Sequence, residues 1–277
     1  MLNLILNYQF IQNAILASLL ASIVCGIIGV IVIEKKLILM SGGIAHTAFG
    51  GVGLGYLIGI NPMLGALAFS ISSSYFITLT NHKAKVNKDV IIALFWSFGM
   101  ALGILFIALA PGYPPDMTSY LFGNILSVTS FDLKLAFWLT IIILTVFFVF
   151  YNDWKSFLFD ETWAKVMGMK TDLMDYILLG LIALTVVVLL RIAGIILTIA
   201  LLTAPAALVS LFSDKLNIRM ITASIVSFIF CVGGLYLSYL LNIPSGACII
   251  ILAVLLYFIS LVINHFIKQR RIQDSEV

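Results

Sequence analysis

The sequence contains few charged residues. Asp, Glu, Lys and Arg make up only 10% of its 277 residues, whereas soluble domains carry about 25%. Hydrophobic residues make up 62% of the chain, and the mean hydropathy is +1.19. This composition excludes a soluble domain and predicts an all-α polytopic membrane protein. The net charge of +3 comes from positive residues scattered among short loops, so we expect no nucleic-acid partner.

Carboxylates are absent from the middle of the apolar segments. All 12 acidic residues fall at segment edges or in loops. Because ion-coupled transporters use buried carboxylates as relays, their absence argues against a secondary transporter. The GxxxxGK[ST] phosphate loop is also missing, since Gly168–Thr171 matches only the end of that pattern. We therefore expect that the chain is not an enzyme, hydrolyses no nucleotide, and needs a partner to supply energy for pumping.

The three cysteines form no CxxC motif. Cys25, Cys231 and Cys248 all stand in apolar segments, so we expect small core residues rather than metal or redox sites. A basic start is missing as well: the first Lys residues, Lys35 and Lys36, follow the first apolar run. This order predicts that there is no cleavable signal peptide and favours an N-terminus outside the cell.

About nine apolar segments are long enough to span a bilayer. They are predicted at 10–33, 41–60, 62–80, 90–110, 132–151, 174–190, 192–212, 220–241 and 245–265. The sixth and seventh form one block from Leu173 to Phe212, broken only at Arg191 and Gly194, so a bent arrangement with eight helices is the alternative. With nine crossings, all but two of the 15 Lys and Arg residues fall inside, the exceptions being Lys134 and Arg191. This bias favours nine crossings and a cytoplasmic C-terminus.

The chain is predicted to form a single transmembrane domain over residues 1–277. An outside loop at 111–131 contains a predicted short helix, 119–126, that we expect to lie at the surface. The inside loop at 152–172 is the longest cytoplasmic segment. Residues 266–277 form a short charged tail, which we expect to be cytoplasmic and mobile.

The inside loop contains a well-bounded short helix. Asp160 can cap its N-terminus, Glu161 complements the helix dipole, and Gly168 suits a left-handed C-terminal cap. Its apolar side chains share one side: Trp163, Val166 and Met167. Such a helix can fit a groove on a partner protein or lie on lipid headgroups, and the sequence leaves both possibilities open.

His46 stands in a glycine-rich stretch that we expect inside the membrane. An ionisable residue there is a functional candidate. Gly42, His46 and Gly50 are four residues apart and share one helix face, which leaves room for a small ligand. Imidazole binds zinc, manganese, iron or nickel, but one histidine is not a site. Further donors are a second His46 across a two-fold axis or the neighbours Met40, Ser41 and Thr47. The alternative is a structural histidine bonded to another helix.

Other conspicuous residues are given structural roles. Arg191 is expected to reach headgroups or outer water, and His82 and His265 are expected to be solvated. Pro205 and Pro244 are expected to bend or start helices. A ladder of glycines predicts close helix packing: Gly51, Gly55 and Gly59.

Several blocks in a fixed order carry a resemblance that covers nearly the whole chain. They are Ser41–His46 with its following glycines, Tyr120–Gly123, Phe159–Glu161, Ala164–Gly168, Gly194–Ala206, Gly234–Ser238 and Pro244–Ala247. In this order they resemble the membrane permeases of metal-type ABC importers. Those permeases take up zinc, manganese or iron with an extracellular solute-binding protein.

The resemblance implies an ABC importer permease fold and a homodimer with two cytoplasmic ATPase subunits. ATP would act through those subunits to drive alternating access, and no cofactor would be permanently bound. The helix with Asp160, Glu161, Ala164 and Gly168 would be the coupling helix seated in the ATPase.

The family motif has an aspartate four residues before the histidine, and this pair is thought to bind the metal. Gly42 stands at the aspartate position here. The resemblance therefore transfers only His46 as a metal ligand, with Gly42, Gly50, Ser41 and Thr47 along the substrate path. Alternatives are a permease for a metal chelate such as a siderophore, and a non-transporting membrane metal-binding protein. An intramembrane enzyme is disfavoured because no nucleophile–base pair accompanies His46.

Overall fold

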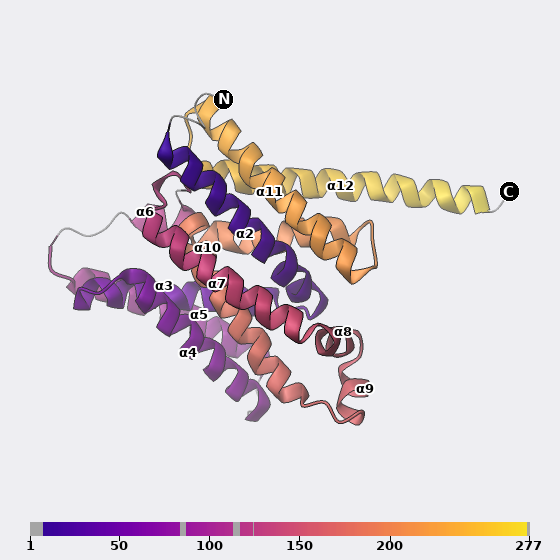
Figure 1. The fold of residues 1–277 in the computed structure, drawn as a ribbon, viewed down its shortest axis with the longest axis horizontal. Coiled ribbons are helices and arrows are strands. Elements are labelled where there is room, and N and C mark those ends of the chain that lie inside the picture. Colours follow the sequence, from indigo (N-terminus) through magenta and orange to yellow (C-terminus); the bar gives the residue numbers. More distant parts are fainter. Residues whose placement is uncertain (1–7, 84–86, 113–116, 124, 276–277) are drawn as a thin grey trace.

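The computed structural model shows a bundle of α-helices. It describes residues 8–83, 87–112, 117–123 and 125–275. No strand occurs in those ranges. The helices are α2 (Gln9–Glu34), α3 (Ile38–Ile58), α4 (Pro62–Lys83), α5 (Lys88–Leu109), α6 (Met117–Phe122), the 3-10 turn η1 (Ile125–Ser127), α7 (Ser130–Val149), α8 (Tyr151–Phe159), α9 (Glu161–Val166), α10 (Thr171–Ser210), α11 (Leu216–Leu241) and α12 (Ser245–Ser275), as labelled in Figure 1. Within the described ranges, 8 helices are long and apolar enough to cross a membrane. The predicted all-α membrane architecture is confirmed.

Helix α10 joins the sixth and seventh predicted segments. Its 40 residues would extend about 60 Å if straight, about twice the thickness of a hydrocarbon core. The helix breaks at Gly194, which has φ 72° and ψ 173°, and Figure 1 shows the second half turning away from the first. The two halves of α10 correspond to the sixth and seventh predicted segments. The prediction counted these segments as two of nine crossings, whereas the structure joins them into one bent helix. The described residues therefore contain 8 long apolar helices.

The break at Gly194 fits against a second glycine with positive φ. Gly123, at the end of α6, has φ 76°. A Cβ atom at Gly194 would lie 2.8 Å from the Cα of Gly123 and 2.8 Å from the carbonyl carbon of Phe122. The two backbones therefore touch directly, and only glycine satisfies both the conformation and the contact.

The sequence predicts that α6 lies at the surface, and the structure shows that one side of it packs against the bundle. Tyr120 is only 8% exposed, and α6 packs against α10. The start of α12 also packs against the end of α6, because a Cβ at Gly246 would overlap the carbonyl oxygen of Phe122. One side of α6 is therefore packed, while Phe122 remains 44% exposed. The predicted place of this helix at the membrane surface stays a prediction.

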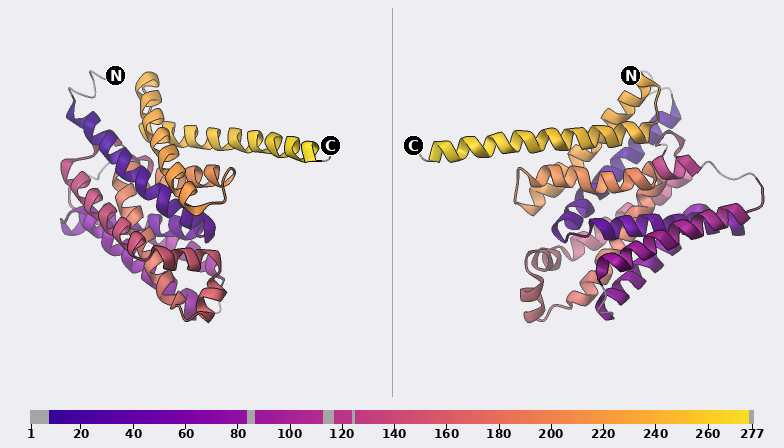
Figure 2. Two further views of the ribbon diagram at one scale, coloured as in Figure 1. Left: turned by 45° about the vertical axis from the view of Figure 1, so that its right-hand side comes forward. Right: turned by 180° about the vertical axis from the view of Figure 1, so that it is seen from behind.

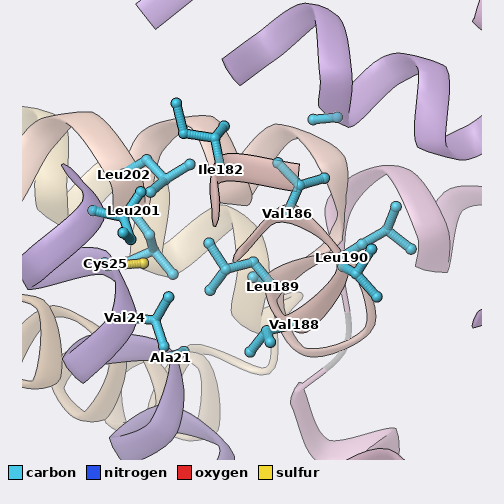
Figure 3. Close-up of a cluster of buried hydrophobic side chains, with 14 of the residues drawn as sticks. Ala21, Val24, Cys25, Ile182, Val186, Val188, Leu189, Leu190, Leu201 and Leu202 are labelled. Carbon is cyan, nitrogen blue, oxygen red and sulfur yellow. The ribbon is translucent and has the colours of Figure 1, made fainter. Parts of the chain in front are cut away.

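The core lies between α2 and the two halves of α10. Figure 3 shows side chains of α2 facing those of α10, and Cys25 is part of this cluster. All three cysteines are unpaired and buried, as predicted. Buried apolar contact of this kind positions α10 relative to α2 and thereby orients the break.

Helix α3 is enclosed by α4 and α5. Close approach is possible because glycines face one another: a Cβ at Gly51 would overlap the Gly65 carbonyl, and one at Gly55 would lie 2.7 Å from the Cα of Pro62. The predicted ladder is thus confirmed at these two positions. Gly59 differs, because it ends α3 as a left-handed cap with open space around it.

Helix α12 leaves the body of the bundle. Figures 1 and 2 show its C-terminal half projecting away from the other helices. It begins directly after Pro244, as predicted, and continues through Ser275, beyond the predicted end at 265. Large apolar side chains remain uncovered along it, including Leu255, Phe258 and Val262.

Candidate functional site

His46 lies in the middle of α3 and is only 8% exposed. Its Nδ1 lies 2.9 Å from the carbonyl oxygen of Gly42, one turn earlier in the same helix. A carbonyl can only accept, so Nδ1 carries the proton and donates it. In the neutral ring the lone pair is then on Nε2, the arrangement of a histidine prepared to bind a metal. The expected alternative, a hydrogen bond to another helix, is not the bond that the structure shows.

The indole of Trp96, from α5, stacks on the His46 ring. The ring centroids are 3.9 Å apart and the planes differ by 22°. The same indole covers Gly42: a Cβ there would lie 3.2 Å from Cζ3 of Trp96 and 3.5 Å from Cδ1 of Ile199. The ring of His46 is therefore held by a backbone acceptor at its edge and by an aromatic face.

The other residues predicted to lie along the substrate path make local hydrogen bonds or pack closely against neighbouring helices. The hydroxyl of Ser41 donates to the carbonyl of Ile38 at 2.8 Å. The hydroxyl of Thr47 donates to Gly43 at 2.7 Å and also contacts the carbonyl of Phe95 on α5 at 3.2 Å. At Gly50 an added Cβ would lie 2.9 Å from the Gly99 carbonyl oxygen. The structure thus brings Gly42 and His46 together as one unit and leaves the roles of Ser41, Thr47 and Gly50 as predictions.

One protomer does not assemble a metal cluster in the part of the chain that the structure describes. No group of three or more His, Cys, Asp or Glu side chains is found there. His265 is exposed and shares a hydrogen bond of 3.0 Å with Gln269, in keeping with the predicted solvated role. The side chain of His82 is outside the described residues. Of the two histidines whose side chains the structure describes, His46 is buried and His265 is exposed.

Arg191 is held by an ion pair within the bundle. Its Nε donates to Oδ2 of Asp132 at 3.0 Å, and the Asp132 side chain is only 6% exposed. The guanidinium also lies 5.8 Å from the ring centroid of Tyr120, whose hydroxyl is 2.8 Å from that of Tyr56. These contacts link α10, α7, α6 and α3 next to the break in α10. The sequence did not predict this ion pair, because the partner carboxylate is supplied by a distant helix. The reach of Arg191 to headgroups or outer water stays a prediction.

The phenol of Tyr120 is held as a neutral hydroxyl. Burial, followed by the hydrogen bond with Tyr56, raises the pKa of Tyr120 above its usual value. The hydroxyl can therefore donate or accept within the pair with Tyr56 over the physiological range.

Arg191→Met is expected to destabilise the protein by about 3 kcal/mol, because it leaves the Asp132 carboxylate buried without its cation. The value is at the lower end of the usual range since the Arg191 side chain is 28% exposed. Adding Asp132→Asn should recover most of the loss. Thermal unfolding of the purified protein in detergent measures this, and strictly additive losses in the two single variants would contradict a coupled pair.

The short helix of the inside loop is α9. The carboxylate of Asp160 accepts from the backbone N–H of Trp163 at 2.9 Å, and Gly168 has φ 87°. Both predicted caps are therefore confirmed. Glu161 accepts from Lys35 Nζ at 2.7 Å, so the start of α9 is tied to the end of α2. Helix α8 was not predicted from the sequence. Its Trp154 is fully buried and anchors this region to the bundle.

An apolar patch is exposed on and beside α9. It comprises Phe159 at 93%, Trp163 at 53%, Val166 at 80% and Met167 at 66% exposure. Ala164, in contrast, is fully buried against the protein. Helix α9 thus presents its large apolar side chains outward while its small residue faces inward, an arrangement suited to a partner groove.

The chain matches the ABC 3 transport family over residues 7–264. It belongs to this family. An uncharacterised membrane protein of Synechocystis sp. is 40% identical over 92% of the chain and 91% of that protein. The manganese transport system membrane protein MntC of Listeria monocytogenes is 33% identical over 92% and 91%. The structure of PsaBC from Streptococcus pneumoniae in complex with Fab aligns with a TM-score of 0.85 and 30% identity, covering 94% of this chain and 93% of that one.

Membership in the ABC 3 transport family establishes a multi-pass membrane subunit of a transporter and confirms the predicted permease fold. Two residues of this ABC 3 protein were not predicted to have a role: Trp96, which stacks on His46, and Asp132, which pairs with Arg191. Asp132 is the third residue of α7 and forms the reciprocal bonds of a capping box with the N-cap residue Thr129. This local signal was readable in the sequence. For Trp96 the sequence carries no comparable signal.

Proposed function

We propose that this protein is the membrane permease of an ABC importer that moves a divalent transition metal ion across the cell membrane. The observation that carries the proposal is His46, a buried histidine on α3 whose Nδ1–H is engaged by Gly42 and whose Nε2 holds the lone pair. Support comes from similar proteins that are named for manganese transport. The metal is cargo, and it needs only a transient site.

We infer that two copies of the chain form the path. One imidazole leaves most of the coordination positions of a transition metal unfilled, and a two-fold axis would supply a second His46. Water and backbone carbonyls would complete the shell during passage. ATP would act through separate ATPase subunits, and a solute-binding protein would deliver the metal from outside.

We infer that α9 faces the cytoplasm, where it meets the ATPase, and that the N-terminus lies outside. The exposed patch of Phe159, Trp163, Val166 and Met167 suits a groove on a protein. The alternative for this helix, contact with lipid headgroups, would not couple to ATP.

Uptake by proteoliposomes tests the proposal. Vesicles would hold the permease with its ATPase and binding protein, and uptake of zinc, manganese and iron would be followed with ATP inside or outside. ATP-dependent uptake of at least one free ion, lost when the ATPase is omitted, is the expected result. Uptake of a siderophore complex that free metal does not compete with would favour the chelate alternative, and binding without flux would contradict transport.

Val166→Asp is expected to uncouple the permease from its ATPase. A carboxylate placed in an apolar interface should cost about 2 kcal/mol of binding, roughly thirtyfold in affinity. Co-purification of the ATPase and ATP-driven uptake measure the effect. Val166→Leu keeps the surface apolar and should behave as wild type. An ATPase that binds Val166→Asp normally would show that α9 is not the contact.

A further inference from the structure

The structure places an indole where a residue with a side chain at position 42 would project. Gly42 has none, and Trp96 fills that space, since a Cβ on Gly42 would already lie 3.2 Å from Cζ3 and 3.7 Å from Cη2 of the indole. Any larger side chain at 42 and the indole in its present position would exclude each other.

The indole that stacks on His46 also lines a cavity. Trp96 lines a space of about 370 Å³ together with Leu39, Asp89, Ile92, Ala93 and Ser97, while its ring stacks on His46 at 3.9 Å. The only carboxylate on this lining is Asp89. Asp89 stands at the N-terminal end of α5, two helical turns before Trp96 and about 10 Å from it along the helix axis. We therefore do not count it among the groups beside the imidazole.

These contacts decide which ligands the imidazole can have near it. On the side of α5, His46 has an aromatic face in place of an oxygen donor. Manganese is suited by carboxylate, carbonyl and water oxygens, whereas zinc accepts imidazole nitrogen readily and needs only about four ligands. A site built on imidazole without an adjacent carboxylate therefore suits zinc better than manganese.

We propose that Trp96 sets the metal preference of this permease, because by occupying the space beside Gly42 it keeps the His46 site free of a carboxylate and selects zinc over manganese. This inference rests on the proposed function. Trp96 acts as a positioning residue: it orients the imidazole and, on the side of α5, excludes a carboxylate side chain from position 42. It does not itself bind the ion.

The test compares zinc and manganese competition in the complete transporter. In proteoliposomes with ATPase and binding protein, wild type should take up labelled zinc in preference to manganese at equal free concentrations. The double variant Gly42→Asp with Trp96→Ala adds a carboxylate and makes room for it. Its zinc-to-manganese uptake ratio should shift toward manganese by about tenfold or more, the size of effect seen when groups around a metal change.

Two further variants keep the result interpretable. Trp96→Phe retains an aromatic face and should keep the zinc preference, and Trp138→Ala changes a tryptophan of α7 that is 63% exposed and should leave the ratio unchanged. The ratio does not depend on how much protein folds. Competition of manganese with labelled zinc for the purified permease, measured as displaced label, gives the preference without transport and works equally in variants that lack Trp96.

Several outcomes would overturn the inference. One is wild type that prefers manganese, and another is a double variant that keeps the wild-type ratio in both uptake and binding. In either case ATP-dependent metal uptake would still stand, so the proposed function would survive. Absence of ATP-dependent uptake of every ion by wild type would remove the proposed function itself, and the inference with it.

Discussion

His46→Ala is expected to reduce ATP-driven metal uptake at least about a hundredfold. Loss of a residue that only orients a metal ligand typically costs 10- to 100-fold, and His46 is the proposed ligand itself. Its neighbours offer only weaker ligands, because Ser41 and Thr47 carry neutral hydroxyls, whereas transition metals such as zinc prefer imidazole nitrogen. Initial uptake rates in proteoliposomes, normalised to folded permease, measure the effect.

His46→Asn distinguishes metal binding from packing. The asparagine amide can still donate to the Gly42 carbonyl in place of Nδ1, but it has no equivalent of the Nε2 lone pair. Uptake should be lost as in the alanine variant while the thermal stability stays near that of wild type. His265→Ala, at an exposed position on α12, should transport normally. Wild-type uptake by His46→Asn would place the path elsewhere.

Gly194→Ala is expected to prevent the protein from reaching a stable fold. The backbone conformation at Gly194 is accessible essentially only to glycine, and alanine would cost about 1–3 kcal/mol from strain alone. Overlap of its Cβ with the backbone of Gly123 and Phe122 adds about 1–3 kcal/mol more. The total is a large part of the stability of a typical protein. Yield of monodisperse protein and its melting temperature in detergent measure the loss.

Gly180→Ala is the matched control, because Gly180 lies in the same helix with no atom near a Cβ placed there. Alanine is favoured over glycine inside a helix by roughly 0.5–1 kcal/mol, so this variant should be as stable as wild type or more so. If Gly194→Ala melted at the temperature of Gly180→Ala, then the break in α10 would not be required by the fold.

Local features of the chain were predictable. The length and composition of the apolar segments gave the correct class, and the caps of α9 followed from Asp160 and Gly168 because capping chemistry acts within one turn. His46 was found because an ionisable residue in an apolar glycine-rich run is conspicuous without any structure. Even the division between the halves of α10 fell close to Gly194.

Contacts between distant parts of the chain were not predictable. Arg191 and Asp132 are 59 residues apart. The sequence alone therefore suggested an arginine that reaches headgroups or outer water and did not reveal its partly buried ion pair. The packing of α6 against α10 and the start of α12 was not predictable, because both partners come from later in the chain. The pairing of Trp96 with Gly42 and His46 has no local pattern, since it depends on how closely α5 approaches α3.

The sequence by itself therefore determined that this is a helical membrane protein of the ABC transporter type with one intramembrane histidine. Its scarcity of charge and its long apolar runs are properties of the chain itself. They can be recognised without knowing which segments pack together. Only the tertiary structure decided which atoms surround that histidine. Glycine-mediated contacts bring α3 and α5 close enough for an indole to stack on an imidazole, and close packing of this kind depends on the whole bundle at once.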